Sequence, residues 1–180
     1  MRNLADVNDE STNDVLEKKL TTIDIWWLIE DGGLTLLLAY LALKHPNYRS
    51  CATLRVFSVA SEEAMAEEKT RLEELLHKFR IEASVIVVPD LKSPSPDTCA
   101  MYASFSTFGE SDRRSIYFMN ISEQMQKYSS SAALVVASLP VPKRTLPVSQ
   151  YMAYLELLSG NNRPTMLVRG NQETVLTFHS

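Results

Sequence analysis

The hydrophobic pattern of the chain is organised around residues 22–43, which read as a strand, a tight turn and a helix. Residues 23–29 form an apolar run of strand length, rich in β-branched and aromatic side chains. Residues 30–33, Glu-Asp-Gly-Gly, interrupt that run with turn-forming side chains. Residues 34–43 then carry no charge, which predicts a helix buried on most faces. Spanning a bilayer takes about 20 apolar residues, so this shorter stretch predicts a core helix.

Further strands and helices follow in alternation. Residues 53–60 alternate as a second strand, and residues 82–89 form a nearly continuous apolar run, typical of a strand covered on both faces. Between these strands, Ser61 is predicted to cap a helix whose apolar residues recur at helical spacing. Asn120 and Glu123 resemble a capping box, which predicts the start of another helix at that point.

The last third of the chain continues the pattern. Residues 132–139 predict a fourth strand, residues 149–158 a helix, and residues 165–168 a fifth strand. Residues 174–178 alternate and predict a final antiparallel strand at an edge. The whole pattern predicts an α/β fold: a mostly parallel open sheet of about five to six strands with helices on both faces and an antiparallel last edge strand.

Two stretches lack this periodicity. Residues 1–20 are polar and acidic, and are predicted to be a mobile leader or the remnant of a linker. Residues 90–114 contain two prolines and many hydroxyl side chains, which predicts a flexible surface connection. Residues 21–180 are then expected to form a single α/β domain, long enough to bury a sizeable core.

Two aromatic features give expectations about exposure. Successive side chains of a strand point to opposite faces, so Trp26 and Trp27 should divide between the two faces and both be shielded in a central strand. One late helix is apolar around most of its circumference: Tyr151, Met152, Tyr154, Leu155, Leu157 and Leu158. We expect that helix to present an apolar patch around Tyr154 to a partner, so that a charge at Tyr154 abolishes association without unfolding the chain.

Composition narrows the class of protein. The formal net charge of −4 argues against a nucleic-acid binder, which normally carries a basic excess. The two cysteines, Cys51 and Cys99, have no metal-type spacing and fit a reducing compartment. The first 20 residues lack the apolar core of a signal peptide.

No catalytic constellation is evident. No serine lies in a Gly-x-Ser-x-Gly elbow, which argues against a hydrolase nucleophile. No histidine has a ligand partner at helical spacing or a cysteine nearby: His45, His77 and His179. The sequence therefore predicts a protein that is not an enzyme and holds no metal or cofactor.

Anion binding is the one candidate chemistry. Gly32 and Gly33 lie between a strand and a helix, where free N–H groups and the helix dipole favour an anion. Arg169 and Gly170 leave the fifth strand at the end where open α/β sheets place ligands. Neither Gly-x-Gly-x-x-Gly nor Gly-Lys-Ser/Thr is present, and the acidic residues before Gly32 would repel a phosphate. The competing interpretation is that the glycines only permit tight turns.

Several blocks of the sequence, in order, resemble the cytosolic C-terminal domain of the cation-chloride cotransporters, solute carrier family 12. The first is the Trp-Trp pair followed by Asp-Gly-Gly and a leucine-rich helix. The others are residues 77–81, 129–140, 151–156, 166–172 and 175–178. Leu-Thr after Asp-Gly-Gly, and the late Gly-Asn-Gln and Val-Leu-Thr-Phe, are more similar to the sodium-dependent branch, the sodium-potassium-chloride or sodium-chloride cotransporters.

The resemblance implies a regulatory and dimer-forming domain on the cytoplasmic face of the plasma membrane. The full-length protein would carry chloride with sodium and/or potassium electroneutrally. Its membrane-embedded domain and a first cytosolic lobe would be partners of this chain, and the chain alone would transport nothing. Two large soluble domains that dimerise beneath a membrane can bias a transporter between its states.

Two other classes of protein are alternatives to a cotransporter domain. A nucleotide-binding sensor of the universal-stress type has similar layering, but its glycine-rich phosphate loop near the fourth strand has no counterpart in residues 138–142. A small α/β enzyme would need a polar constellation that the sequence does not contain.

Overall fold

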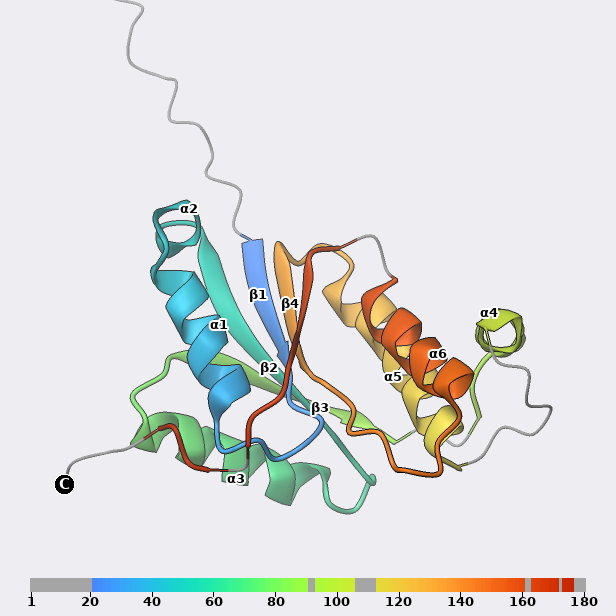
Figure 1. Ribbon diagram of the computed structural model, residues 1–180. Coiled ribbons are helices and arrows are strands. Elements are labelled where there is room, and N and C mark those ends of the chain that lie inside the picture. The colour runs from blue at the N-terminus through green and yellow to red at the C-terminus, as the bar shows by residue number, and fades with distance from the viewer. Residues whose placement is uncertain (1–20, 91–92, 106–112, 161–162, 172, 177–180) are drawn as a thin grey trace, which may run out of the picture.

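The computed structural model describes residues 21–90, 93–105, 113–160, 163–171 and 173–176. In them the chain forms a five-stranded sheet with helices on both faces, which confirms the predicted α/β class (Figure 1). The strands are β1 (Thr21–Trp26), β2 (Ala52–Ala60), β3 (Ala83–Pro89), β4 (Leu134–Ser138) and β5 (Thr165–Val168). They pair in the order β3-β2-β1-β4-β5, and every pair is parallel.

The central strand β1 explains why the tryptophan pair is buried. Ile23 pairs with Leu54 on one side and Leu134 on the other, so β1 has no free edge. Trp26 is fully buried, stacks on Phe57 with ring centroids 4.6 Å apart, and belongs to the core on one face. Trp27 is 8% exposed and belongs to the core on the other face. The predicted division of the two indoles, and their shielding, are confirmed.

The helices form a layer on each face of the sheet. They are α1 (Leu34–Lys44), α2 (Pro46–Arg49), α3 (Met65–Lys78), α4 (Pro96–Phe105), α5 (Arg113–Ser129) and α6 (Val148–Ser159). Side chains of α1 and α3 fill the core around Trp27, and those of α4, α5 and α6 fill the core around Trp26. Figure 1 shows α4 at the outer side of α5 and α6.

The predicted antiparallel last strand is wrong for residues 174–176, which have no strand conformation. Instead this segment crosses the turn that precedes α1, where the Val175 N–H donates to the Gly32 carbonyl over 3.0 Å. The described sheet therefore ends at β5. Residues 177 and 178 of the predicted strand lie outside the described residues, as does the predicted leader, residues 1–20.

The predicted flexible connection, residues 90–114, contains a helix instead. Ser95 precedes α4, and its hydroxyl accepts the Thr98 N–H over 3.3 Å, as a helix-capping serine does. The predicted helix start at Asn120 is also wrong, because α5 begins at Arg113 and places Asn120 in its buried middle. Residues 91–92 and 106–112 lie outside the description.

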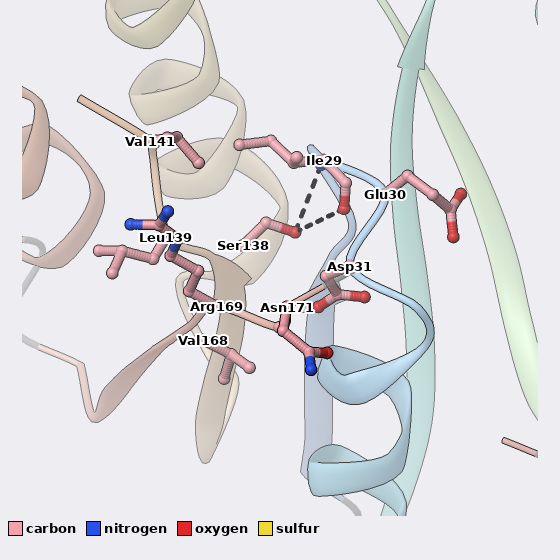
Figure 2. Close-up of a pocket in the computed structure, with 10 residues that line it drawn as sticks. Ile29, Glu30, Asp31, Ser138, Leu139, Val141, Val168, Arg169 and Asn171 are labelled. Atoms are coloured by element: carbon pink, nitrogen blue, oxygen red, sulfur yellow. Dashed lines mark hydrogen bonds between the residues drawn. The ribbon is translucent and has the colours of Figure 1, made fainter. Parts of the chain in front are cut away.

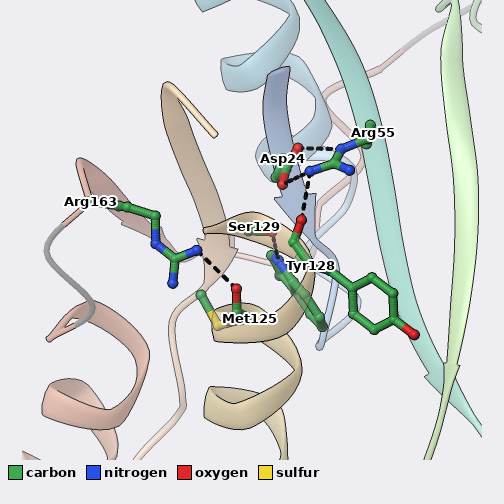
Figure 3. Close-up of polar contacts among 7 residues, drawn as sticks. Asp24, Arg55, Met125, Tyr128, Ser129 and Arg163 are labelled. Atoms are coloured by element: carbon green, nitrogen blue, oxygen red, sulfur yellow. Dashed lines mark hydrogen bonds and ion pairs between the residues drawn. The ribbon is translucent and has the colours of Figure 1, made fainter. Parts of the chain in front are cut away.

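A buried ion pair joins the sheet to the end of α5 (Figure 3). Asp24 of β1 is fully buried and accepts two hydrogen bonds from the Arg55 guanidinium of β2, at 2.8 and 2.6 Å. The same guanidinium donates to the Tyr128 carbonyl over 2.9 Å, and the Trp26 indole donates to the Ser129 hydroxyl over 3.0 Å. Strand register places Asp24 opposite Arg55. Together, the bonds from Arg55 and Trp26 hold β2 and β1 against the end of α5.

Candidate functional site

The carboxyl ends of β1 and β4 meet where the strand order reverses. In open α/β sheets this switch point is the usual place for a ligand. The segments that leave β1, β4 and β5 all contribute to it, and they bring Arg169 and Gly170 close to the turn that contains Gly32 and Gly33. The structure therefore brings the four predicted anion-site residues together at the carboxyl end of the sheet.

The helix end that an external anion would use is already capped by Asp31. This side chain is 4% exposed. One carboxylate oxygen accepts the Gly33 N–H over 3.1 Å, and the other accepts the Thr35 N–H over 3.0 Å together with the Thr35 hydroxyl. A carboxylate at a helix N-terminus also interacts favourably with the helix dipole. The Gly33 and Thr35 N–H groups at this helix end are thus bound within the chain.

The glycines of this edge lie where the chain approaches itself closely. Gly32 and Gly33 have φ values of 72° and 87°, a region that favours glycine. A Cβ on Gly33 would lie 2.8 Å from the Leu176 side chain, and one on Gly32 would overlap the Glu173 carbonyl. A Cβ on Gly170 would likewise overlap the Asp31 carbonyl. Each of these glycines is therefore required by the close packing of the chain, independently of any ligand.

A pocket of about 220 Å³ opens between these segments (Figure 2). At its base the Ser138 hydroxyl accepts the Leu28 and Ile29 N–H groups over 3.2 and 3.4 Å, and so joins the end of β4 to the end of β1. Glu30 and Asp31 bring negative charge to the lining, and Arg169 brings positive charge. Figure 2 shows the Arg169 side chain extending away from Asp31.

The volume and charge of this pocket bear on the predicted anion site. Drug-sized ligands usually occupy about 300–1,000 Å³, and two acidic residues against one basic residue disfavour a polyphosphate. Binding of a small anion beside Arg169 stays a prediction, and close packing of the turns explains Gly32, Gly33 and Gly170 without any ligand.

A second hollow, of about 290 Å³, lies beside it over the ends of β1 and β2. Glu68 accepts hydrogen bonds from Arg71 at 2.8 and 2.9 Å and from Ser58 at 2.7 Å. The bond from Arg71 is the largest cause of a lowered Glu68 pKa, which burial opposes and Ser58 reinforces. Burial, with a smaller contribution from Asp90, raises the pKa of Tyr117 at this hollow to about 12. The contacts of Glu68 join the first turn of α3 to β2.

The solvent face of α6 is the other candidate site. Val148 is 78% exposed and Met152 is 55% exposed, and they lie one helical turn apart on the same face. Leu155 continues the stripe and is half-buried. The opposite face of α6 packs into the core. Large apolar side chains grouped on a surface are typical of an interaction site.

Comparison with known proteins decides the family. The family model described as solute carrier family 12 matches residues 5–180 of the chain. The chain belongs to solute carrier family 12. Over 180 aligned residues, 88% of the chain, it is 34% identical to the bumetanide-sensitive sodium-(potassium)-chloride cotransporter of Manduca sexta. It is 32% identical over 88% of its length to solute carrier family 12 member 1 of Rattus norvegicus, and 34% identical over 91% to member 3 of Mus musculus.

The family assignment confirms the resemblance drawn from the sequence, including its similarity to the sodium-dependent branch. The chain spans only about a fifth or less of these relatives, 17% of the Manduca sexta and Rattus norvegicus proteins and 20% of the Mus musculus protein. Among the residues that the structure describes, no helix is both long and apolar enough to cross a bilayer. Within the same residues no group of three or more His, Cys, Asp or Glu side chains is placed to hold a metal ion.

The structure also corrects the residue that was expected at the centre of the apolar patch on α6. Tyr154 is fully buried, and its hydroxyl lies 3.0 Å from the Ser115 hydroxyl in the layer between α5 and α6. Sequence reasoning included Met152 in the apolar helix but missed Val148, because the helix was expected to begin one residue later. An apolar residue at the first turn of an amphipathic helix, on the Met152 side, is the signal that would have found it.

Proposed function

We propose that this chain is a regulatory and dimer-forming cytosolic domain of an electroneutral cation-chloride cotransporter of solute carrier family 12. In the full-length protein, a membrane-embedded domain and a first cytosolic lobe would be its partners, and chloride would move with sodium and/or potassium. The names of the relatives support the ions: that of the Manduca sexta protein includes sodium, potassium and chloride.

The observation that carries the assembly role is the apolar stripe of α6. Burying an exposed valine or methionine side chain contributes roughly 1.5–3 kcal/mol, so a surface that leaves two of them in water gains from being covered. The stripe replaces the patch first expected around Tyr154, which lies in the core and cannot reach a partner. A second copy of the chain is the proposed occupant, with the first cytosolic lobe enlarging the contact.

Sedimentation velocity over a range of concentrations tests the assembly role. A stable interface buries about 1,200–2,000 Å² in total, more than one helical stripe offers, so the 180-residue chain should associate weakly and reversibly. Met152→Glu should remove that association and leave the circular dichroism spectrum unchanged. Leu41→Glu is the matched control, because Leu41 of α1 is 54% exposed against 55% for Met152. A chain that stays monomeric at every concentration, or equal effects of the two substitutions, would remove the α6 assignment.

A chimera tests the regulatory role. This chain would replace the matching segment of the Manduca sexta cotransporter, and chloride uptake would be measured in cells with equal surface amounts of each variant. The chimera should transport, and Met152→Glu in the chimera should lower uptake more than Leu41→Glu does. Equal uptake by the chimera and its two variants would mean that the exposed face of α6 has no regulatory role.

A further inference from the structure

The segment that leads into α4 combines two features that the proposed assembly role does not use. Residues 93–96 read Ser-Pro-Ser-Pro, and both Ser93 and Ser95 are exposed. A residue that precedes proline is held in an extended conformation, because the proline ring clashes with a helical one. Ser93 precedes Pro94 outside any helix, and Ser95 immediately precedes Pro96, the first residue of α4. Each exposed hydroxyl thus lies directly before a proline, which is the pattern that a proline-directed kinase recognises.

Ser95 is also the point where α4 is joined to α5. Its backbone N–H donates to a Glu123 carboxylate oxygen over 2.7 Å. Its hydroxyl accepts the Thr98 N–H over 3.3 Å and lies 3.1 Å from the Thr98 hydroxyl, so it caps α4. The carboxylate of α5 therefore lies directly against the residue that a kinase would modify.

Near its other end, α4 is joined to α5 by a buried contact. Tyr102 is 3% exposed, and its hydroxyl lies 2.9 Å from the Ser115 hydroxyl. Ser115 also accepts a hydrogen bond of 2.9 Å from the Gln150 amide of α6. Figure 1 shows α4 at the outside of the α5–α6 layer, and Tyr102 belongs to the core around Trp26. Loosening α4 would therefore expose part of that core, while the strand pairing and the core around Trp27, which α4 does not contact, stay in place.

We propose that residues 93–96 are a proline-directed phosphorylation site and that phosphate on Ser95 releases α4 from α5. The Ser95 hydroxyl oxygen forms a bond to the γ-phosphorus of ATP held by the kinase, the bond from that phosphorus to the β–γ bridging oxygen breaks, and ADP leaves. The hydroxyl proton passes to the catalytic aspartate of the kinase.

The electrostatic consequence follows from the contacts of Ser95. The phosphate brings a charge of about −1.5 to −2 at neutral pH beside the Glu123 carboxylate and two residues from the exposed Asp97. The new charge repels Glu123, whose hydrogen bond to the Ser95 N–H is the contact that seats the start of α4. The phosphate still favours the N-terminus of α4 as a helix. We therefore expect α4 to separate from α5 rather than to lose its own helical turns first.

The experiment uses the 180-residue chain with Ser93→Ala, which leaves Ser95 as the one serine followed by proline in residues 93–96. A purified mitogen-activated protein kinase and ATP are added, and peptide mass spectrometry locates the phosphate. Hydrogen exchange of α4 is then compared before and after phosphorylation. We expect phosphate on Ser95 and an increase of about tenfold or more in α4 exchange, with β1 and β4 unchanged.

Glu123→Gln separates repulsion from simple loss of the cap, because glutamine keeps an oxygen acceptor without the charge. Phosphorylation should accelerate α4 exchange much less in that variant. The proposal is overturned if the kinase leaves Ser95 unmodified, or if α4 exchange is unchanged or slower after phosphorylation. Equal acceleration in the chain with Glu123 and in the glutamine variant overturns the repulsion mechanism as well. The proposal does not rest on dimerisation through α6.

Discussion

Replacing Arg55 with methionine should destabilise the fold by about 3–5 kcal/mol, the usual cost of leaving one partner of a buried ion pair alone. Asp24 is fully buried, and its two carboxylate oxygens accept from Arg55 at 2.8 and 2.6 Å. Methionine fills much of the same volume without a charge. The substitution therefore leaves the buried Asp24 carboxylate without its hydrogen-bonded partner, with only the longer-range charge of Arg163 acting on it among the described residues, and removes the donor to the Tyr128 carbonyl.

Urea unfolding followed by tryptophan fluorescence measures this cost, because Trp26 and Trp27 both lie in the core. For a domain of about 150–250 residues, each kcal/mol shifts Tm by roughly 2–4 °C. The Arg55→Met variant should therefore melt roughly 6–20 °C lower than the parent.

Two further variants test the reasoning behind that number. Arg71→Met breaks an ion pair with Glu68 in which the arginine side chain is 52% exposed, and it should cost no more than about 1 kcal/mol. Asp24→Leu combined with Arg55→Met leaves no buried charge and should recover most of the lost stability. The burial argument is refuted if Arg55→Met costs no more than Arg71→Met, or if the double variant is less stable than Arg55→Met alone.

Three other predictions concern the turn, the pocket and the α4 contact. Gly33→Val should lower the unfolding free energy by about 1 kcal/mol or more, because φ is positive there and a Cβ would lie 2.8 Å from Leu176; an unchanged urea midpoint would contradict this. Adding ATP should leave Tm unchanged, and a clear rise would favour the nucleotide-sensor alternative. Burial acts to raise the Glu123 pKa, but hydrogen bonds from Ser95 and Thr98 outweigh it and lower that pKa. The resulting stability is present above the unfolded pKa of about 4.3 and is lost as pH falls through the folded pKa. Glu123→Gln should therefore reduce the loss of urea resistance below about pH 4, and an unchanged acid profile would contradict the assignment.

Much of the sheet was predictable because its strands are short apolar runs bounded by turn residues. The run that contains β1 was expected to reach residue 29, but the strand ends at Trp26 and the Leu28 and Ile29 N–H groups bond to the Ser138 hydroxyl instead. Whether the Leu28 and Ile29 N–H groups bond to a strand or to a side chain depends on which strand lies next to β1. Hydrophobic periodicity within one segment does not show which strand that is.

The errors share a physical cause, which is that local pattern does not show what lies on each side of an element. α4 begins with Ser95 followed by proline at its first position, a recognisable helix start that the surrounding hydroxyl residues obscured. α5 is buried on most sides, so its polar Asn120 was taken for a cap. α6 is apolar nearly all round, and its packing against α4, α5 and β5 decides that Tyr154 is buried and Met152 is exposed.

The buried pair of Asp24 and Arg55 was also missed, although a signal was present. Asp24 interrupts an apolar run between Ile23 and Ile25, and a charge in the middle of a buried strand requires a partner. Its partner is fixed by the register of β1 against β2, which pairs residues 31 positions apart in the chain.

Site-specific cross-linking can show whether α6 forms the proposed contact between two copies of this chain. In a background with Cys51→Ser and Cys99→Ser, single cysteines replace Met152 or, as the control, Leu41, and a short bismaleimide is added. A symmetric dimer presents the same patch from both copies, so cysteines at position 152 should lie near each other. We expect a covalent dimer for Met152→Cys and almost none for Leu41→Cys. A cross-link of equal yield at the two positions, or none at either, would contradict it.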